Sequence, residues 1–256
     1  MSPDPIPLRS ASTLECRNCG AGAPVDEHFC PNCDRILAVQ RFGDYFSFFG
    51  IPRQLTLDAA DLERKFRDLS RKFHPDYFYN AAPAERLASL ERSSYLNDAY
   101  RTLRNPVLRI EHLLAIEGLP PTRHEDSAVK VPPALLEEVF ALNEELDEIR
   151  ELRESRGADN AALAARLASA RKPIEKKRDE HEREVHELSA RWDAQAGGDA
   201  AARKATLETL RERLLERTYI NNLLAGIERE AESLKPGAES QKPVAGGLQA
   251  SGSGHE

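Results

Sequence analysis

The chain has 256 residues, of which 40% are hydrophobic and 31% are charged, and its formal net charge is −7. This length suits two ordinary domains, and the acidic balance argues against a protein that binds nucleic acid through its whole surface. No apolar run approaches the roughly 18 residues of a membrane span, and residues 1–12 lack the apolar stretch of a secretory signal. Leu, Ala, Glu and Arg recur with helical periodicity, which predicts an all-α protein.

Residues 1–13 are proline-rich, and we expect them to be disordered. Residues 14–40 hold all the cysteines of the chain, as two Cys-x-x-Cys pairs. These cysteines are Cys16, Cys19, Cys30 and Cys33. Four thiolates at this spacing suit one tetrahedral metal ion, and a closed structural zinc site is favoured because no coordination position stays open. The segment is too short for a core, so the metal should contribute most of its folding free energy.

Other interpretations of the four thiols stay open. Disulfides or free thiols are the structural alternatives, and an iron site of rubredoxin-like spacing is the chemical one. His28 lies between the two pairs, and we expect it to face solvent rather than to bind the metal. Gly20 follows the first pair, where a tight turn often needs a positive φ.

Residues 41–56 predict a short aromatic helix that Asp44 caps. Residues 58–73 predict a second helix with Asp58 as its N-cap. Its buried face is Leu62, Phe66, Leu69 and Phe73. The other face is basic, and its cations are Arg64, Lys65, Arg67, Arg71 and Lys72. On charge alone, a solvated helix surface is the ordinary interpretation of those cations.

His74, Pro75 and Asp76 follow this helix directly. Proline cannot continue a helix, so the three residues are predicted to form an exposed loop. A hydrolase interpretation of the His/Asp pair is disfavoured, because no nucleophile is placed nearby and nothing excludes water. A third helix is predicted at about residues 84–104 and a fourth at residues 107–116.

This order of elements resembles a J-domain: a short helix, a basic helix, His-Pro-Asp, and a third helix with Asn97–Leu103 and then Asn105-Pro106. Residues 45–50 and 103–114 are similar, more narrowly, to the HscB-type co-chaperones of iron–sulfur cluster biogenesis. The resemblance spans about residues 42–229. The double Cys-x-x-Cys resembles the extra module of zinc-containing, eukaryotic-type members.

The remaining chain predicts a linker, a bundle and a tail. Residues 119–132 are a proline-containing linker, and the ranges 133–154, 158–195 and 200–229 have helical apolar stripes. Short connections between them favour an antiparallel three-helix bundle over residues 133–230. Pro173 should kink or split the middle helix. Residues 231–256 are rich in Gly, Ser, Pro and Gln and are expected to be disordered.

A second stripe on the first bundle helix steps by four residues off the core face. It consists of Leu136, Phe140, Glu144 and Glu148. Apolar groups that run into carboxylates suit a partner surface, although an ordinary boundary residue with solvated charges is the plainer interpretation. In the HscB family this helix binds the iron–sulfur scaffold protein, and Tyr219 lies where the family places an aromatic that completes that face.

The resemblance thus implies an all-α protein with an N-terminal zinc module, a four-helix J-domain at 41–118 and a C-terminal bundle. It implies no enzyme activity. The basic face with His74–Asp76 would dock on a DnaK/HscA-type ATPase chaperone and stimulate it, while the bundle delivers an IscU-type scaffold. A thiolate-metal redox or metal-transfer protein and a zinc-ribbon nucleic-acid-binding J-protein are the alternatives.

We expect neither a nucleic acid nor a membrane as a partner, and weak self-association stays open. Bacterial cytoplasm is favoured over the mitochondrial matrix.

Overall fold

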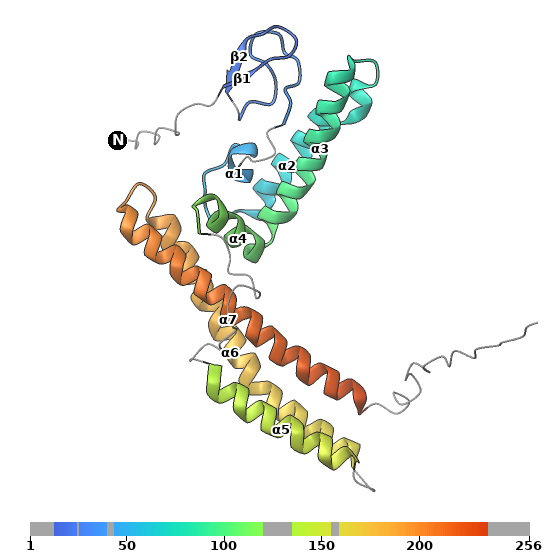
Figure 1. Cartoon of the computed structure of the whole chain (residues 1–256), viewed down its shortest axis with the longest axis vertical. Coiled ribbons are helices and arrows are strands. Elements are labelled where there is room, and N and C mark those ends of the chain that lie inside the picture. The colour runs from blue at the N-terminus through green and yellow to red at the C-terminus, as the bar shows by residue number, and fades with distance from the viewer. Residues whose placement is uncertain (1–12, 25, 40–43, 120–134, 155–158, 235–256) are drawn as a thin grey trace, which may run out of the picture. The chain divides into compact units, whose positions relative to one another are not determined.

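The computed structural model describes residues 13–24, 26–39, 44–119, 135–154 and 159–234. Helices dominate these ranges, and the β-structure in them is a small N-terminal hairpin (Figure 1), so the all-α prediction is confirmed. None of the described helices is apolar enough over a sufficient length to cross a membrane. The predicted terminal disorder at residues 1–12 and 235–256 and most of the predicted linker lie outside the described residues.

The metal module, residues 13–39, consists of two knuckles. Strands β1 (Thr13–Glu15) and β2 (Gly22–Pro24) pair antiparallel, with Leu14 opposite Ala23, and the turn between them carries the first cysteine pair. A single bridge between Phe29 and Ile36 closes the second turn. Each knuckle thus brings a Cys-x-x-Cys pair to the end of a short hairpin.

The two knuckles repeat one hydrogen-bond pattern. Gly20 N donates to Cys16 O at 2.8 Å, and Asp34 N donates to Cys30 O at 2.9 Å. Gly20 has φ +71° and Asp34 has φ +55°, so each knuckle ends in a left-handed residue. The predicted positive φ at Gly20 is confirmed, and Asp34 is a residue type that tolerates the same conformation.

Helices α1 (Tyr45–Phe48), α2 (Ala59–Phe73), α3 (Pro83–Arg104) and α4 (Pro106–Ile116) follow, with a single 3₁₀ turn, η1 (Pro75–Phe78), after α2. Helices α2 and α3 lie side by side as a hairpin (Figure 1). The predicted caps are confirmed: the Asp44 carboxylate accepts from Phe46 N, and Asp58 accepts from Ala60 N and Asp61 N. Each cap satisfies amides that lack an intrahelical acceptor.

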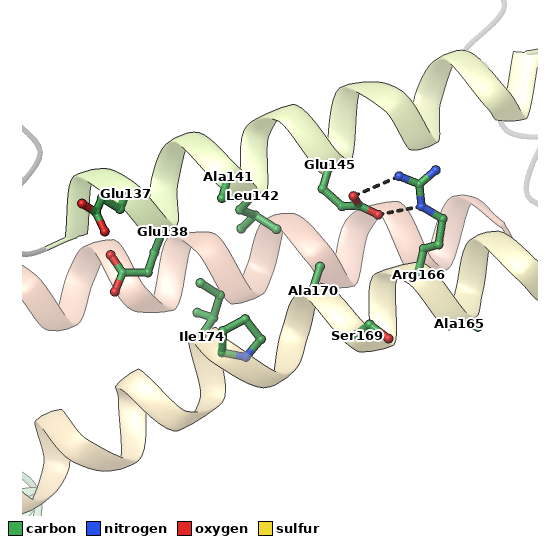
Figure 2. Close-up of a pocket in the computed structure, with 11 residues that line it drawn as sticks. Glu137, Glu138, Ala141, Leu142, Glu145, Ala165, Arg166, Ser169, Ala170 and Ile174 are labelled. Atoms are coloured by element: carbon green, nitrogen blue, oxygen red, sulfur yellow. Dashed lines mark hydrogen bonds and ion pairs between the residues drawn. The ribbon is translucent and has the colours of Figure 1, made fainter.

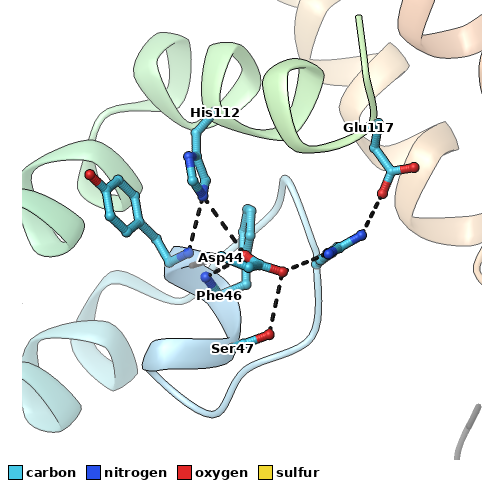
Figure 3. Close-up of polar contacts among 7 residues, drawn as sticks. Asp44, Phe46, Ser47, His112 and Glu117 are labelled. Atoms are coloured by element: carbon cyan, nitrogen blue, oxygen red, sulfur yellow. Dashed lines mark hydrogen bonds and ion pairs between the residues drawn. The ribbon is translucent and has the colours of Figure 1, made fainter. Parts of the chain in front are cut away.

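A polar cluster ties α1 to α4 and to the loop before α2 (Figure 3). Arg53 Nε donates to Asp44 at 2.6 Å, and Arg53 Nη1 donates to Glu117 at 2.8 Å. His112 Nε2 accepts from Tyr45 N at 3.1 Å and lies 3.8 Å from Asp44 Oδ1. Burial raises the pKa of Asp44, but the interactions with His112 and Arg53 outweigh it, so this pKa lies below its ordinary value.

Helices α6 (Asn160–Ala194) and α7 (Ala200–Ser233) contribute to two compact units. Residues 182–215 belong with residues 1–129, and their apolar side chains complete the core over α1–α4. Those side chains are Leu188, Trp192, Leu207, Leu210 and Leu214. The Asp193 carboxylate also accepts from Leu55 N at 2.7 Å and from Thr56 N at 2.8 Å. Trp192 is buried, and it packs in this first core rather than with α5.

The second unit contains α5 (Leu136–Glu154) and the remaining parts of α6 and α7. Its buried residues include Leu142, Leu146, Ile149, Leu163, Leu167, Ile174, Ile220, Leu224 and Ile227. Helix α6 is not split at Pro173, which lies inside the continuous helix. Ala170 and Ile174 on either side of the proline pack into this core. Helix α7 runs past residue 229 to Ser233, because Leu234 is also buried there, so the expected tail begins later than residue 231.

Candidate docking tip and metal centre

The candidate docking tip, His74–Asp76, lies at the end of α2 and is exposed, as predicted. The side chains of His74 and Asp76 are 52% and 87% accessible to solvent. The tip is not a loop, however: Pro75 starts the 3₁₀ turn η1, and Asp76 N donates to His74 Nδ1 at 3.3 Å. Proline suits this first position because its missing amide would have no acceptor there. His74 therefore caps the turn that displays Asp76.

Two serines on α3 hold the residue before the tip. Ser89 Oγ donates to Phe73 O at 2.7 Å, and Ser93 Oγ donates to the same carbonyl at 3.0 Å. They satisfy a carbonyl in the last turn of α2 that has no intrahelical donor. Sequence reasoning missed both residues, because the sequence around them does not show that they face the end of α2.

The basic face, Arg64, Lys65, Arg67, Arg71 and Lys72, lies on α2 as predicted. Three of its cations form ion pairs along the helix. These pairs are Arg64 with Asp61, Arg67 with Glu63, and Arg71 with Asp68. Five cations thus stand against three carboxylates in α2, so the positive excess is smaller than the basic residues alone suggested. Each pair is exposed and stabilises the helix by only about 0.3–0.5 kcal/mol.

Aromatic side chains surround the tip on its exposed side. Tyr77 and Tyr79 are both largely exposed, and the Tyr77 ring lies 6.1 Å from the His74 ring, edge to face. Aromatic side chains are enriched where proteins bind one another. Sequence reasoning did not single out these tyrosines, and their position beside the tip extends the surface that a partner would meet.

The four cysteine sulfurs converge. Cys16 Sγ lies 3.7 Å from Cys33 Sγ, and Cys19 Sγ lies 3.7 Å from Cys30 Sγ, while all four lie within 4.8 Å of one another. A tetrahedral ion with metal–sulfur bonds of about 2.3 Å requires sulfur–sulfur distances of about 3.8 Å. A disulfide requires about 2.05 Å. The donor set and spacing fit one closed tetrahedral metal site.

The polar groups around the sulfurs act differently on different cysteines. The Asn32 side chain and then the Ala21 backbone lower the pKa of the Cys19 thiol to about 6 by hydrogen bonding. Asn18 Nδ2 donates to Cys33 Sγ at 3.5 Å. A thiolate is the form that binds a metal. The backbone amide of Asn32 favours a thiolate at Cys30, but burial and the neighbouring cysteine side chains outweigh it and raise the pKa of the Cys30 thiol to about 11. The surrounding groups therefore favour the metal-binding charge state at Cys19 but not at Cys30.

Arg92 of α3 joins the metal module to α3. Its guanidinium donates to the carbonyl oxygens of Leu37 at 2.7 Å, Glu27 at 3.1 Å and Ala38 at 3.3 Å. Arg92 Nη1 also lies 2.7 Å from His28 Nδ1, and arginine can only donate, so the imidazole nitrogen accepts. Only 2% of the Arg92 surface is exposed, and burial lowers its pKa to about 10.

The expectation that His28 faces solvent is wrong. The ring packs edge-on against Phe48 at 4.8 Å and Phe73 at 4.9 Å. Burial and then the charge of Arg92 lower the pKa of His28 to about 4. The sequence pattern of the cysteine pairs did not reveal this, because the neighbours of His28 come from α1, α2 and α3.

The second stripe on α5, which was predicted as a partner surface, is exposed in part. Phe140 is 70% exposed and Leu136 is 37% exposed, and Glu144 also faces solvent. Glu148 is held by Arg166 of α6 at 2.6 Å, and the same guanidinium binds Glu145 at 2.7 and 2.9 Å (Figure 2). Tyr219 lies half-buried on α7 against the second core. Phe140 is therefore the most accessible apolar member of the stripe.

A groove opens between α5 and α6 beside Glu145 (Figure 2). Its floor is apolar, with Leu142, Ala170 and Ile174, and Glu137 and Glu138 lie at one end. Lys177 of α6 lies 3.4 Å from Glu138, so part of this acidic rim is neutralised within the bundle.

The α2–α3 hairpin with its exposed His-Pro-Asp tip, preceded by α1 and followed by α4, has the architecture of a J-domain. A Cys₄ module precedes it, and a helical bundle follows.

The fold of the chain is similar to that of the human co-chaperone protein HscB. The crystal structure of human HscB matches with a TM-score of 0.58 and 24% identity, over 85% of this chain and 98% of that chain. The chaperone HscB from Vibrio cholerae matches with a TM-score of 0.47 and 25% identity, over 75% of this chain and 100% of that one. No protein-family model matches the chain. The expected HscB-type fold with a Cys₄ module is thus confirmed.

Proposed function

We propose that this chain is a co-chaperone that docks on a DnaK/HscA-type ATPase chaperone and stimulates its ATP hydrolysis. The observation that carries the proposal is the exposed docking tip at the end of a basic helix, in a chain whose fold is similar to that of human HscB. The chain itself performs no covalent step. Docking favours the hydrolysis-competent state of the partner, so the rate rises in the partner's own site.

The tip and the basic face have separate tasks in this proposal. His74 and Asp76 make the directed contacts, and Pro75 limits the conformational entropy that the tip loses on docking. The basic face accelerates encounter with an acidic groove on the chaperone, an effect that weakens as salt increases. The two tasks predict that tip variants act on stimulation and that charge variants act on association.

Substitution His74→Gln is expected to abolish stimulation of chaperone ATPase, because the imidazole that caps η1 and makes a proposed directed contact would be lost. Steady-state ATP turnover of a matched chaperone, titrated with each variant, is the measurement. His186→Gln, an exposed histidine on α6, is the matched control and should stimulate like the wild type. Full stimulation by the His74→Gln variant, with unchanged helicity, would refute the docking role.

The second part of the proposal is delivery of an IscU-type iron–sulfur scaffold protein. Leu136, Phe140, Glu144, Glu148 and Tyr219 form the proposed scaffold surface, and Phe140 supports it best because a side chain 70% exposed has no role in the core. Binding two proteins through two parts of one chain raises their effective concentration for each other. The chain is then a bivalent adaptor.

Phe140→Ala should weaken scaffold binding by about tenfold or more, as loss of a large aromatic anchor commonly does. Glu148→Gln should weaken it far less, since Arg166 already engages that carboxylate. Titration calorimetry with the scaffold measures both affinities, and Leu152→Ala, another exposed apolar residue of α5, is the control. Equal affinity of the Phe140→Ala variant and the wild type would remove the stripe from the proposal.

We propose zinc as the metal of the Cys₄ site, with a structural role. The closed set of four thiolates supports this role, and the same set also suits iron. Elemental analysis and absorbance of the purified protein separate the two: one zinc and no visible colour are expected, whereas ferric thiolate absorbance would favour the redox alternative.

A further inference from the structure

The metal module reaches the residue that precedes the docking tip. Phe73 ends α2 and is fully buried, and two of its ring neighbours come from the module: His28 at 4.9 Å and Phe29 at 6.1 Å. The guanidinium carbon of Arg92 lies 5.6 Å from the centre of the same ring. Phe73 is thus held by the module on its side chain and by Ser89 and Ser93 on its carbonyl.

Arg92 depends on the module for its hydrogen bonds. Among the described residues its hydrogen-bond partners are the three module carbonyls and His28, and all of them are neutral. A buried guanidinium without acceptors is strongly unfavourable, so Arg92 keeps its buried position only while the module presents these groups. Displacement of the module would release Arg92 and remove two aromatic neighbours from Phe73 together.

The module in turn depends on its metal. Its buried cluster is Cys16, Ala23, Cys30 and Leu37, so two of the four members are themselves metal ligands. Such a cluster supplies little hydrophobic stabilisation, and binding of the metal provides the folding free energy of the knuckles. Loss of the ion should therefore unfold the loop that carries His28 and the acceptors of Arg92.

We infer that the metal-loaded Cys₄ module is an internal support of the docking tip, and that Arg92 is the positioning residue that couples metal binding to the order of His74–Asp76. The functional importance of the tip rests on the proposed co-chaperone function. The coupling between metal binding and the order of the tip does not depend on that function. Metal loss then lowers the fraction of molecules whose tip is ready to dock, without removing any docking residue.

Amide hydrogen exchange of the full chain tests the coupling in the absence of any partner. The peptide over residues 71–81 should exchange about tenfold faster once a chelator has removed the metal, and it should recover on addition of Zn²⁺. A peptide over residues 163–174, in the second unit, should not change. Unchanged exchange at 71–81, while residues 14–38 lose protection, would overturn the inference.

Arg92→Met tests the route of the coupling in metal-loaded protein. The variant should retain one metal ion and show faster exchange at 71–81, and removal of its metal should add little further change there. Arg101→Met, an exposed arginine of the same helix paired with Asp98, is the control and should respond to the chelator like the wild type. Full additivity of Arg92→Met and metal removal would exclude Arg92 as the coupling residue.

Chaperone ATPase assays separate the coupling from the proposed function. Faster exchange at 71–81 together with weaker stimulation after metal removal supports both. Faster exchange with no stimulation even by metal-loaded wild-type protein keeps the coupling and refutes the co-chaperone proposal. Equal stimulation with and without metal, despite faster exchange, overturns the claim that the support matters for docking.

Discussion

Asp44 shows how much one side chain can organise at the residue scale. Its carboxylate caps α1 and binds Arg53, which reaches on to Glu117 at the end of α4. Its side chain is 10% exposed, so these charge-assisted hydrogen bonds form with little screening by water. Asp44 thus helps to hold the aromatic helix against α4, together with the hydrogen bond from Tyr45 N to His112.

Substitution Asp44→Asn should destabilise the protein by about 1.5–3 kcal/mol at pH 7, the usual contribution of hydrogen bonds to a charged group. The pKa of Asp44 is lowered in the folded state, so its contribution is complete above the ordinary carboxyl value and is lost as pH falls through the folded value. Urea unfolding at pH 7 and near pH 3 measures the difference, which should shrink in acid. Asp98→Asn, at an exposed pair, should have little effect at either pH.

Residues of this kind also mark the limit of prediction from sequence. The caps at Asp44 and Asp58 follow from local backbone chemistry, and both were predicted. Arg92, Ser89 and Asp193 act on segments far away in the chain, which no local pattern reveals. Each is a polar residue with buried or backbone-directed partners, and only the tertiary fold identifies those partners.

At the scale of elements, more of the positive charge of α2 is neutralised by acidic residues of the same helix than its basic residues suggest. Glu63 and Asp68 pair with Arg67 and Arg71, so the helix presents alternating charges along one side. Periodicity correctly predicted the buried face of α2, because burial depends on spacing alone. The positive charge of the basic face was overestimated, because the acidic residues between the cations lie on the same side of the helix.

The double substitution Glu63→Gln and Asp68→Asn should raise the association rate with an acidic chaperone surface, because the carboxylates that compete for the arginines are removed. Stopped-flow association at increasing salt is the measurement, and the advantage should fade above roughly 0.15 M salt, where screening shortens the electrostatic range. Glu137→Gln with Asp147→Asn, on α5, is the control for the change in net charge. A rate indifferent to the α2 pair would show that α2 takes no part in encounter.

At the scale of the whole molecule, the two hydrophobic cores do not coincide with the two domains that the sequence motifs predict. Residues 182–215 pack with α1–α4 rather than with α5, although α6 and α7 run uninterrupted into the second unit. The sequence showed the apolar stripes of α6 and α7 but not which core each end joins, since an amphipathic helix can pack on any apolar surface. Within the first unit, Asp193 of α6 accepts hydrogen bonds from two backbone amides of the loop before α2.

Asp193→Ala should destabilise the first unit by about 1–3 kcal/mol, because the amides of Leu55 and Thr56 would lose their acceptor. Protection of those two amides, read by NMR hydrogen exchange, should fall well before that of residues in the second unit. Asp199→Ala, which removes a cap at the start of α7, is the comparison and should act on that helix end. Retained protection at residues 55 and 56 would mean that the contact carries no stability.

The contribution of Leu207, Leu210 and Leu214 to the first core has a consequence for synthesis on the ribosome. Residue 119 leaves the exit tunnel long before residue 214, and at usual elongation rates the interval is on the order of ten seconds. Through that interval the nascent α1–α4 segment exposes apolar side chains that its own length cannot cover. We therefore expect the nascent chain to need protection from aggregation until residues 182–215 have been made.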